Sequence, residues 1–151
     1  RFFSEVVQTE IDRSRRYNHM LTLAYIDIDN FKAVNDRFGH NAGDALLTTI
    51  ASKIKENLRA VDLLARLGGD EFAILFPETD AQGAKIVIDR IRRNIDKTAH
   101  GKDWPITLSV GVVTCPKVPV SMDKLIMLAD EAMYMAKTAG KDTVTYREYA
   151  T

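Results

Sequence analysis

Two aspartates, Asp27 and Asp29, close a stretch over residues 20–28 that is apolar at odd and even positions alike. Such a stretch predicts a central strand covered on both faces, and the alternation of a strand puts both carboxylates on one face. For Asp29, capping of the helix that follows is the favoured interpretation. Asp27 is harder to explain structurally, because a carboxylate buried beside an apolar run is costly without a cation or a hydrogen-bond donor.

A second acidic pair, Asp70 and Glu71, follows Gly68-Gly69 between two apolar runs. The two glycines tolerate the positive φ of a tight hairpin turn, and Gly-Gly-Asp alone indicates no more than a turn. The turn needs neither carboxylate, however, and a hairpin beside the first strand would bring the pair towards Asp27. Converging carboxylates that keep some water suit Mg²⁺, which is typically held by one or two carboxylates and substrate phosphates.

The hydrophobic period predicts the helices and strands that must position these residues. Helices are predicted from Ser4 as cap to about Tyr17, in a short polar segment after Asp29, over 44–58, from Thr79 or Asp80 to about Ile95, and from Ser121 to just before Gly140. Strands are predicted over 20–28, 63–67, 72–76, 106–112 and 143–146. The order αβααββαβαβ predicts an α+β fold, an α/β sandwich in which helices cover a mixed sheet.

The composition limits the class of protein. With 151 residues, 46% hydrophobic and 28% charged, the chain is expected to fold as one globular domain. Its 21 Lys and Arg balance 21 Asp and Glu, so it lacks the basic field of a nucleic-acid-binding protein. Its single cysteine, Cys115, excludes an internal disulfide and favours a reducing compartment. Without a long apolar run or a signal-peptide pattern, a cytoplasmic location is expected.

The segment Gly68-Gly69-Asp70-Glu71-Phe72 carries the motif that names the GGDEF family of diguanylate cyclases, which the chain resembles over essentially its whole length. Further matching blocks are Asp27-Ile28-Asp29-Asn30-Phe31-Lys32, Asn35-Asp36, Gly39-His40, Gly43-Asp44, the strand ending Thr107-Leu108-Ser109-Val110-Gly111, and Ala129-Asp130 to Lys137 and Gly140. The resemblance implies one GGDEF domain over 1–151 and a mainly antiparallel sheet, similar to nucleotidyl cyclases and polymerase palm domains. It also implies condensation of two GTP into cyclic di-GMP, with release of two pyrophosphates.

The resemblance implies a metal site for Mg²⁺, or Mn²⁺ in its place, with two ions per active half-site. Asp27 and Asp70 are expected to coordinate through their side chains and Ile28 through its carbonyl. Glu71 is expected to be a further metal-binding or proton-handling carboxylate. Asp70, Glu71 and Lys32 are thus the expected catalytic residues. Two cations that bridge the phosphates would neutralise charge, activate a 3′-hydroxyl and stabilise the leaving pyrophosphate.

The implied nucleotide contacts lie on both sides of this metal site. Asn35 and Asp44 correspond to the family's guanine-binding residues; a carboxylate beside an amide suits guanine, and adenine would leave these groups unpaired. Asp44 could instead simply favour a helix N-terminus. Phosphate contacts are expected from the backbone of Phe31 and Lys32, from the Gly68-Gly69 turn, and from the ammonium groups of Lys32, Lys137 and Lys141. Lys141 stands where the family commonly has arginine, and it keeps the charge but loses the bidentate fork.

An Arg-x-x-Asp pair, Arg59 and Asp62, is separated from the double glycine by five residues. Alone it would indicate a surface ion pair worth roughly 0–1 kcal/mol. Its spacing resembles the family's inhibitory site, at which the product cyclic di-GMP binds, and Arg90 lies where some members supply a second arginine from the neighbouring domain. Product inhibition is therefore expected at these three residues.

Two functions remain open from the sequence: a cyclase, and a catalytically inactive GGDEF module that binds GTP or cyclic di-GMP as a sensor. The intact carboxylates favour the cyclase, which is expected to act as a homodimer because two equivalent nucleotides must attack each other. The chain begins at Arg1, without methionine and without the segment that precedes this arginine in the family. It is therefore expected to come from a longer protein with an upstream sensory or receiver domain.

Several other residues are assigned structural roles or none. His40 is interpreted as a hydrogen-bonding turn residue and Trp104 as a packing residue, and Cys115 is given no role. The methionines Met122, Met127, Met133 and Met135 are expected to fill gaps in or near the core.

Overall fold

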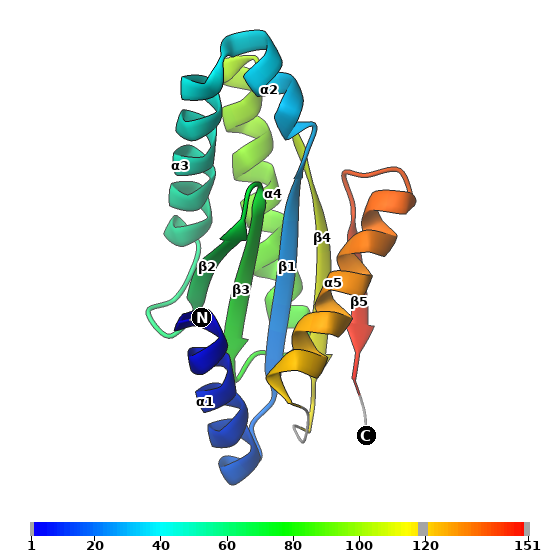
Figure 1. Ribbon diagram of the computed structural model, residues 1–151. Coiled ribbons are helices and arrows are strands. Elements are labelled where there is room, and N and C mark those ends of the chain that lie inside the picture. Colours follow the sequence, from blue (N-terminus) through cyan, green and yellow to red (C-terminus); the bar gives the residue numbers. More distant parts are fainter. Residues whose placement is uncertain (1, 118–120, 150–151) are drawn as a thin grey trace.

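The computed structural model describes residues 2–117 and 121–149 (Figure 1). Its elements are α1 (Phe2–Tyr17), β1 (Leu21–Asp29), α2 (Phe31–Phe38), α3 (His40–Glu56), β2 (Leu63–Gly68), β3 (Glu71–Pro77), α4 (Ala81–Lys102), β4 (Thr107–Cys115), α5 (Met122–Thr138) and β5 (Val144–Glu148). This order confirms the one predicted from the hydrophobic period.

The strands form one sheet in the order β2-β3-β1-β4-β5, with β1 at its centre. β1 pairs antiparallel with β3 and with β4, and β2 pairs antiparallel with β3. Among the described strands, only β4 and β5 pair in parallel. The predicted mixed, mainly antiparallel sheet is therefore confirmed.

The two faces of β1 pack against different helices, which explains why its sequence is apolar at both parities. Ala24, Ile26 and Ile28 lie in a core cluster with α3 and α4. Leu23 and Tyr25 lie in a second cluster with α1 and α5. Figure 1 shows α1 and α5 in front of the sheet and α4 behind it. By alternation, Asp27 and Asp29 belong to the face that α5 covers.

The position of α5 over β4 depends on Gly111. A Cβ atom at this glycine would collide with the backbone of Ala129 and Met133, so the helix can approach the strand this closely only because position 111 lacks a side chain. Lys137 lies one helical turn beyond Met133, on the same helix face. The close packing thereby brings a lysine over the carboxylate end of β1.

Three helices have boundaries that differ from those predicted. α4 extends to Lys102 rather than Ile95, because Ala99 continues its apolar stripe and is 4% exposed. α3 begins at His40, four residues before Asp44, and follows Gly39, whose φ of +90° ends the preceding helix. α1 begins at Phe2, so Ser4 lies inside the helix and is not its cap.

The predicted caps and packing residues are otherwise mostly confirmed. Of the two candidates before α4, Asp80 is the cap, since its Oδ1 accepts a 2.8 Å hydrogen bond from the N–H of Gly83. Ser121 caps α5 in the same way at 3.2 Å. Met127 and Met135 are 43% and 44% exposed, so their assignment to the core was wrong. None of the described helices combines the length and the apolarity needed to cross a bilayer.

Candidate active site

The pairing of β1 and β3 brings the two acidic pairs together. Asp27 lies opposite Glu71 in the strand register. One residue further, the N–H of Ile28 donates a 3.1 Å hydrogen bond to the carbonyl of Asp70. The structure thus places Asp27, Ile28, Asp70 and Glu71, which the sequence predicts as metal-site residues, at one end of the sheet.

The turn that carries Asp70 is held by an arginine that the sequence analysis did not single out. Gly69 has a φ of +29°, in the region that favours glycine. Its carbonyl accepts hydrogen bonds from both Nε and Nη2 of Arg66, at 3.0 and 2.8 Å. A guanidinium fork on the turn carbonyl fixes the start of β3 relative to β2.

Asp27 is incompletely satisfied by the protein. Its Oδ2 lies 3.1 Å from Nζ of Lys137, while its buried Oδ1 finds no hydrogen-bond partner among the described residues. Burial is the main cause that raises the pKa of Asp27 to about 6; the charges of Asp70 and Glu71 act in the same direction, and Lys137 acts against them. The site therefore has more negative charge than its own lysine neutralises.

Asp29 has the opposite environment. It is fully buried and accepts hydrogen bonds from Thr107 and Ser109 at 2.6 and 2.7 Å, from the N–H of Asp142 at 3.0 Å and from Lys137 at 3.1 Å. Burial opposes its ionisation, but the bonds from Thr107 and Ser109 and its other donors outweigh burial and lower its pKa. The predicted capping role was wrong: the N-cap of α2 is Asn30, which makes no side-chain cap bond.

Tyr25 is a second residue of the site that the sequence analysis missed. Its hydroxyl donates a 3.0 Å hydrogen bond to Oε1 of Glu71. Burial, and then this carboxylate, raise the pKa of Tyr25. The alternation of the strand could have identified Tyr25, because residues 25 and 27 lie on the same strand face. A tyrosine in a buried strand also needs a hydrogen-bond partner for its hydroxyl.

The acidic residues fit a divalent cation in their chemistry. Among the described residues, no three His, Cys, Asp or Glu side chains already surround one metal position. The unpartnered Oδ1 of Asp27 and the two carboxylates beside it nevertheless supply hard oxygen donors and an uncompensated negative charge. Asp29 has no comparable free position, since four donors already occupy its two oxygens.

The predicted guanine-binding residues lie near each other. The Oδ1 of Asn35 is buried without a hydrogen-bond partner among the described residues, and a Cβ on Gly43 would collide with this atom. The next residue, Asp44, is exposed and lines a hollow of about 460 Å³ together with Arg66 and Phe72. Asp44 lies beyond the first turn of α3, so the alternative of a helix N-terminal charge is not supported.

The predicted phosphate-binding residues surround the start of α2. Phe31 is partly buried against the core and Lys32 is exposed in the first turn. Nζ of Lys141 lies 3.5 Å from Oδ1 of Asn30, so the loop after α5 reaches the beginning of α2. Lys137 lies beside the aspartates. Of the three lysines, Lys137 and Lys141 thus contact residues at this end of β1.

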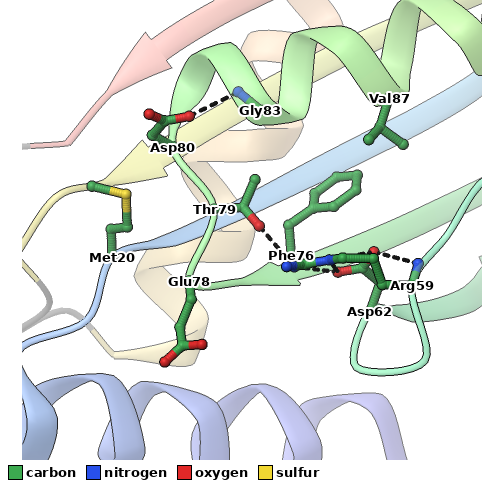
Figure 2. Close-up of a pocket in the computed structure, with 9 residues that line it drawn as sticks. All are labelled: Met20, Arg59, Asp62, Phe76, Glu78, Thr79, Asp80, Gly83 and Val87. Carbon is green, nitrogen blue, oxygen red and sulfur yellow. Dashed lines mark hydrogen bonds and ion pairs between the residues drawn. The ribbon is translucent and has the colours of Figure 1, made fainter.

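Arg59 and Asp62 lie at the other end of β1 and β3, where Leu21 pairs with Pro77. Figure 2 shows them together with Glu78 and Met20. Arg59 donates to Asp62 through Nη2 at 2.8 Å, and to the carbonyl of Pro77 and the hydroxyl of Thr79 at the same distance. The Asp62 side chain is 1% exposed, so the pair is not the surface ion pair that its spacing alone would indicate. Nε of Arg90 is bonded to Oδ1 of Asn57 at 2.7 Å.

A hollow of about 340 Å³ lies beside Arg59 and Asp62. It is bounded by Arg59 and Asp62, by the segment from Glu78 to Asp80 and by Val87 of α4, as Figure 2 shows. Half of the Arg59 side chain is exposed, and Arg59 lines this hollow, so the hollow could admit a ligand beside it.

Comparison with known proteins identifies the class that has this fold and acidic cluster. Residues 1–143 match the sequence family described as diguanylate cyclase, GGDEF domain. The chain therefore belongs to the GGDEF family, which confirms the resemblance found in the sequence.

Individual relatives agree with this assignment. The chain is 36% identical over 148 residues to diguanylate cyclase DosC of Escherichia coli K12, covering 95% of this chain and 32% of DosC. It is 40% identical over 156 residues to the biofilm architecture maintenance protein MbaA of Vibrio cholerae, covering 95% of this chain and 20% of MbaA. The crystal structure of the GGDEF domain of DgcB from Caulobacter crescentus in complex with c-di-GMP superposes with a TM-score of 0.87 at 29% identity. The match covers 95% of this chain and 87% of the DgcB chain. The chain spans a third or less of the length of these two curated relatives.

Proposed function

We propose that this chain condenses two GTP into cyclic di-GMP. In each half-reaction a 3′-hydroxyl oxygen forms a bond to the α-phosphorus of the other GTP, the bond from that phosphorus to pyrophosphate breaks, and the hydroxyl proton passes to a base. The observation that carries the proposal is the buried, unpartnered oxygen of Asp27 beside Asp70 and Glu71, within a GGDEF domain. Carboxylates in this arrangement favour the binding of a divalent cation, and Mg²⁺ held by one or two carboxylates typically also binds substrate phosphates.

The metal site would consist of Asp27, Asp70, Glu71 and the carbonyl of Ile28. Mg²⁺ bound there would neutralise phosphate charge and lower the pKa of the attacking hydroxyl. Glu71 is the residue to which we assign the hydroxyl proton, and the hydrogen bond from Tyr25 orients its carboxylate for that role. We assign Lys32, Lys137 and Lys141 to the negative charge of the triphosphate and of the departing pyrophosphate.

Guanine specificity is assigned to Asn35 and Asp44. A carboxylate accepts from the N1–H and the exocyclic amine of guanine, and the amide of Asn35 provides a neighbouring polar contact. Gly43 is required between them, because any side chain there would displace the Asn35 amide. Adenine would leave these polar atoms unpaired, which is the physical basis of discrimination by large factors.

The reaction requires two copies of the chain. Each subunit is assigned one GTP, so two acidic clusters must face each other in a homodimer. We assign control of this assembly to an upstream sensory or receiver domain of a longer protein. Arg59, Asp62 and Arg90 are assigned to product inhibition by cyclic di-GMP, a proposal supported by the hollow beside Arg59. The same hollow also favours the second candidate function, a sensor module without turnover.

The first experiment incubates the purified protein with GTP and Mg²⁺ and separates the products by chromatography. Asp70→Asn and a metal-free sample are the negative controls, and Asp12→Asn is the matched control for loss of an exposed aspartate. Cyclic di-GMP formed only by wild-type and Asp12→Asn protein with metal would support the cyclase. Dimeric protein that binds GTP and forms no product would contradict it and favour the sensor module.

A further inference from the structure

Asp29 joins three separate segments of the chain at the active end of the sheet. Thr107 and Ser109 on β4 each donate one hydroxyl to it, and Asp142 in the loop after α5 donates its backbone N–H. Lys137 of α5 completes the set. Each carboxylate oxygen of Asp29 thus has two donors, and the side chain is fully buried.

Two of these donors belong to the segment that carries the lysines assigned to phosphate. Lys137 is held between Asp29 and Asp27, at 3.1 Å from each. Asp142 directly follows Lys141, so the bond from its N–H to Asp29 fixes the backbone next to that lysine. Asp29 therefore contacts one lysine directly and the other through the neighbouring residue.

The loop around Lys141 needs such a restraint. Lys141 and Asp142 have φ values of +66° and +48°, which L residues rarely adopt, and they do so consecutively. The N–H of Lys141 donates to the carbonyl of Ala136 at 3.1 Å, and Arg92 donates to the carbonyl of Asp142 at 3.0 Å. Together with Asp29, these bonds hold a backbone that the sequence alone would not favour.

We propose that Asp29 is a positioning residue for the triphosphate: it sets the places of Lys137 and Lys141 and does not bind the metal. This inference rests on the proposed function. Asp27 and Asp29 accordingly have different roles. Asp27 keeps an oxygen free for a cation, whereas both oxygens of Asp29 are used by the protein. A metal ion at Asp29 would have to displace at least one of its short hydroxyl bonds.

The test compares nucleotide binding by wild-type protein and Asp29→Asn, using calorimetry with GTP and with guanosine, each with Mg²⁺ and with EDTA. We expect the affinity for GTP to fall about tenfold, the scale found when a supporting hydrogen-bond partner of a site is removed. The affinity for guanosine should not change, because guanosine has no phosphates. The loss should persist in EDTA, because it acts through lysines.

Two further variants keep the test decisive. Thr107→Val removes one hydroxyl that donates to Asp29 and alters no charge. It should also weaken GTP binding, by a smaller factor than Asp29→Asn does. If Asp29→Asn does not fold, Thr107→Val provides the test. Asp89→Asn is the matched control, because it removes an aspartate that pairs with a lysine elsewhere, Lys85 on α4 at 3.0 Å. It should leave both affinities unchanged.

The outcomes separate this inference from its alternatives. A loss of GTP affinity seen only with Mg²⁺ would make Asp29 a metal ligand and overturn the proposal. Equal losses for GTP and guanosine would show a merely structural role and overturn it too, as would unchanged GTP binding. Wild-type protein that binds neither nucleotide would overturn the proposed function itself, and this inference with it.

Discussion

The two ends of the β1–β3 pair hold charged clusters of opposite character. Leu21 pairs with Pro77 at one end and Asp27 with Glu71 at the other, so at ~3.4 Å per residue the clusters lie about 20 Å apart. At the acidic end Asp27 has an unpartnered oxygen and a raised pKa. At the other end Asp62 is fully enclosed and doubly bonded by Arg59, through its backbone N–H at 2.8 Å and its guanidinium.

This difference separates two ways in which a fold can prepare a site. At neutral pH the acidic end bears an electrostatic cost in the free protein that a bound cation would relieve. The Arg59 end bears no such cost, because its ion pair is complete and only the open side of the guanidinium remains for a ligand. Charge removal should therefore have opposite effects on stability at the two ends.

The largest expected effect is on activity at the acidic end. Asp27→Asn should lower cyclic di-GMP formation by about 10³-fold, because metal-ion stabilisation of a transition state is worth several kcal/mol. The same change should raise the free energy of unfolding of the metal-free protein by about 1 kcal/mol, since it removes a poorly compensated carboxylate. Initial rates and urea denaturation in EDTA measure the two effects. If Asp27→Asn were inactive and also less stable than wild type, the acidic end would not bear the electrostatic cost that distinguishes it from the Arg59 end.

The second prediction concerns stability at the other end. Asp62→Asn should lower the free energy of unfolding by about 2 kcal/mol, less than for a fully buried pair because half of the Arg59 side chain is exposed. Urea denaturation of this variant next to Asp12→Asn, which should lose less than about 0.5 kcal/mol, measures the effect. Equal losses in the two variants would mean that the ion pair is not structural.

Most of the fold could be predicted from sequence because the apolar period changes with each element. Residues 20–28 and 106–112 are good examples, since burial on both faces or strict alternation leaves few other interpretations. Boundaries were less certain where the signal came from the backbone. The start of α3 depends on the positive φ of Gly39, and the length of α4 depends on one further buried alanine.

The convergence of the acidic residues at one end of the sheet could be predicted from sequence, but their bonding could not. Asp27 and Asp70 could be matched from their motifs, whereas the donors to Asp29 come from β4 and from the loop after α5, about 80 and 113 positions away in the sequence. Local reasoning therefore assigned Asp29 to the nearest helix. Tyr25 was missed for the same reason, because its partner Glu71 lies 46 positions away. Arg66 was missed although Gly69 is only three positions away, because the apolar pattern does not show that a side chain folds back onto a turn carbonyl.

The third prediction concerns pH. The folded protein holds the pKa of Asp27 at about 6, above its ordinary value of 3.8, so the folded state binds more protons than the unfolded state between these values. The contribution of Asp27 to stability is therefore present at pH 4 and is lost as the pH rises through 6. In EDTA, the free energy of unfolding of wild type relative to Asp27→Asn should fall by about 1–2 kcal/mol from pH 4 to pH 7. A flat difference would show that Asp27 is already compensated without metal.

The smallest expected effect tests whether the two ends act separately. Arg90 is exposed and hydrogen-bonded to Asn57, so Arg90→Ala should cost less than about 1 kcal/mol of stability. If cyclic di-GMP binds beside Arg59, the lost guanidinium should weaken its binding about tenfold, which corresponds to 1.4 kcal/mol. Calorimetric titration with cyclic di-GMP and with GTP compares the two ends in one variant. Losses of similar size for both ligands would mean that Arg90 affects the acidic end as well, since a separate product site should lose affinity for cyclic di-GMP alone.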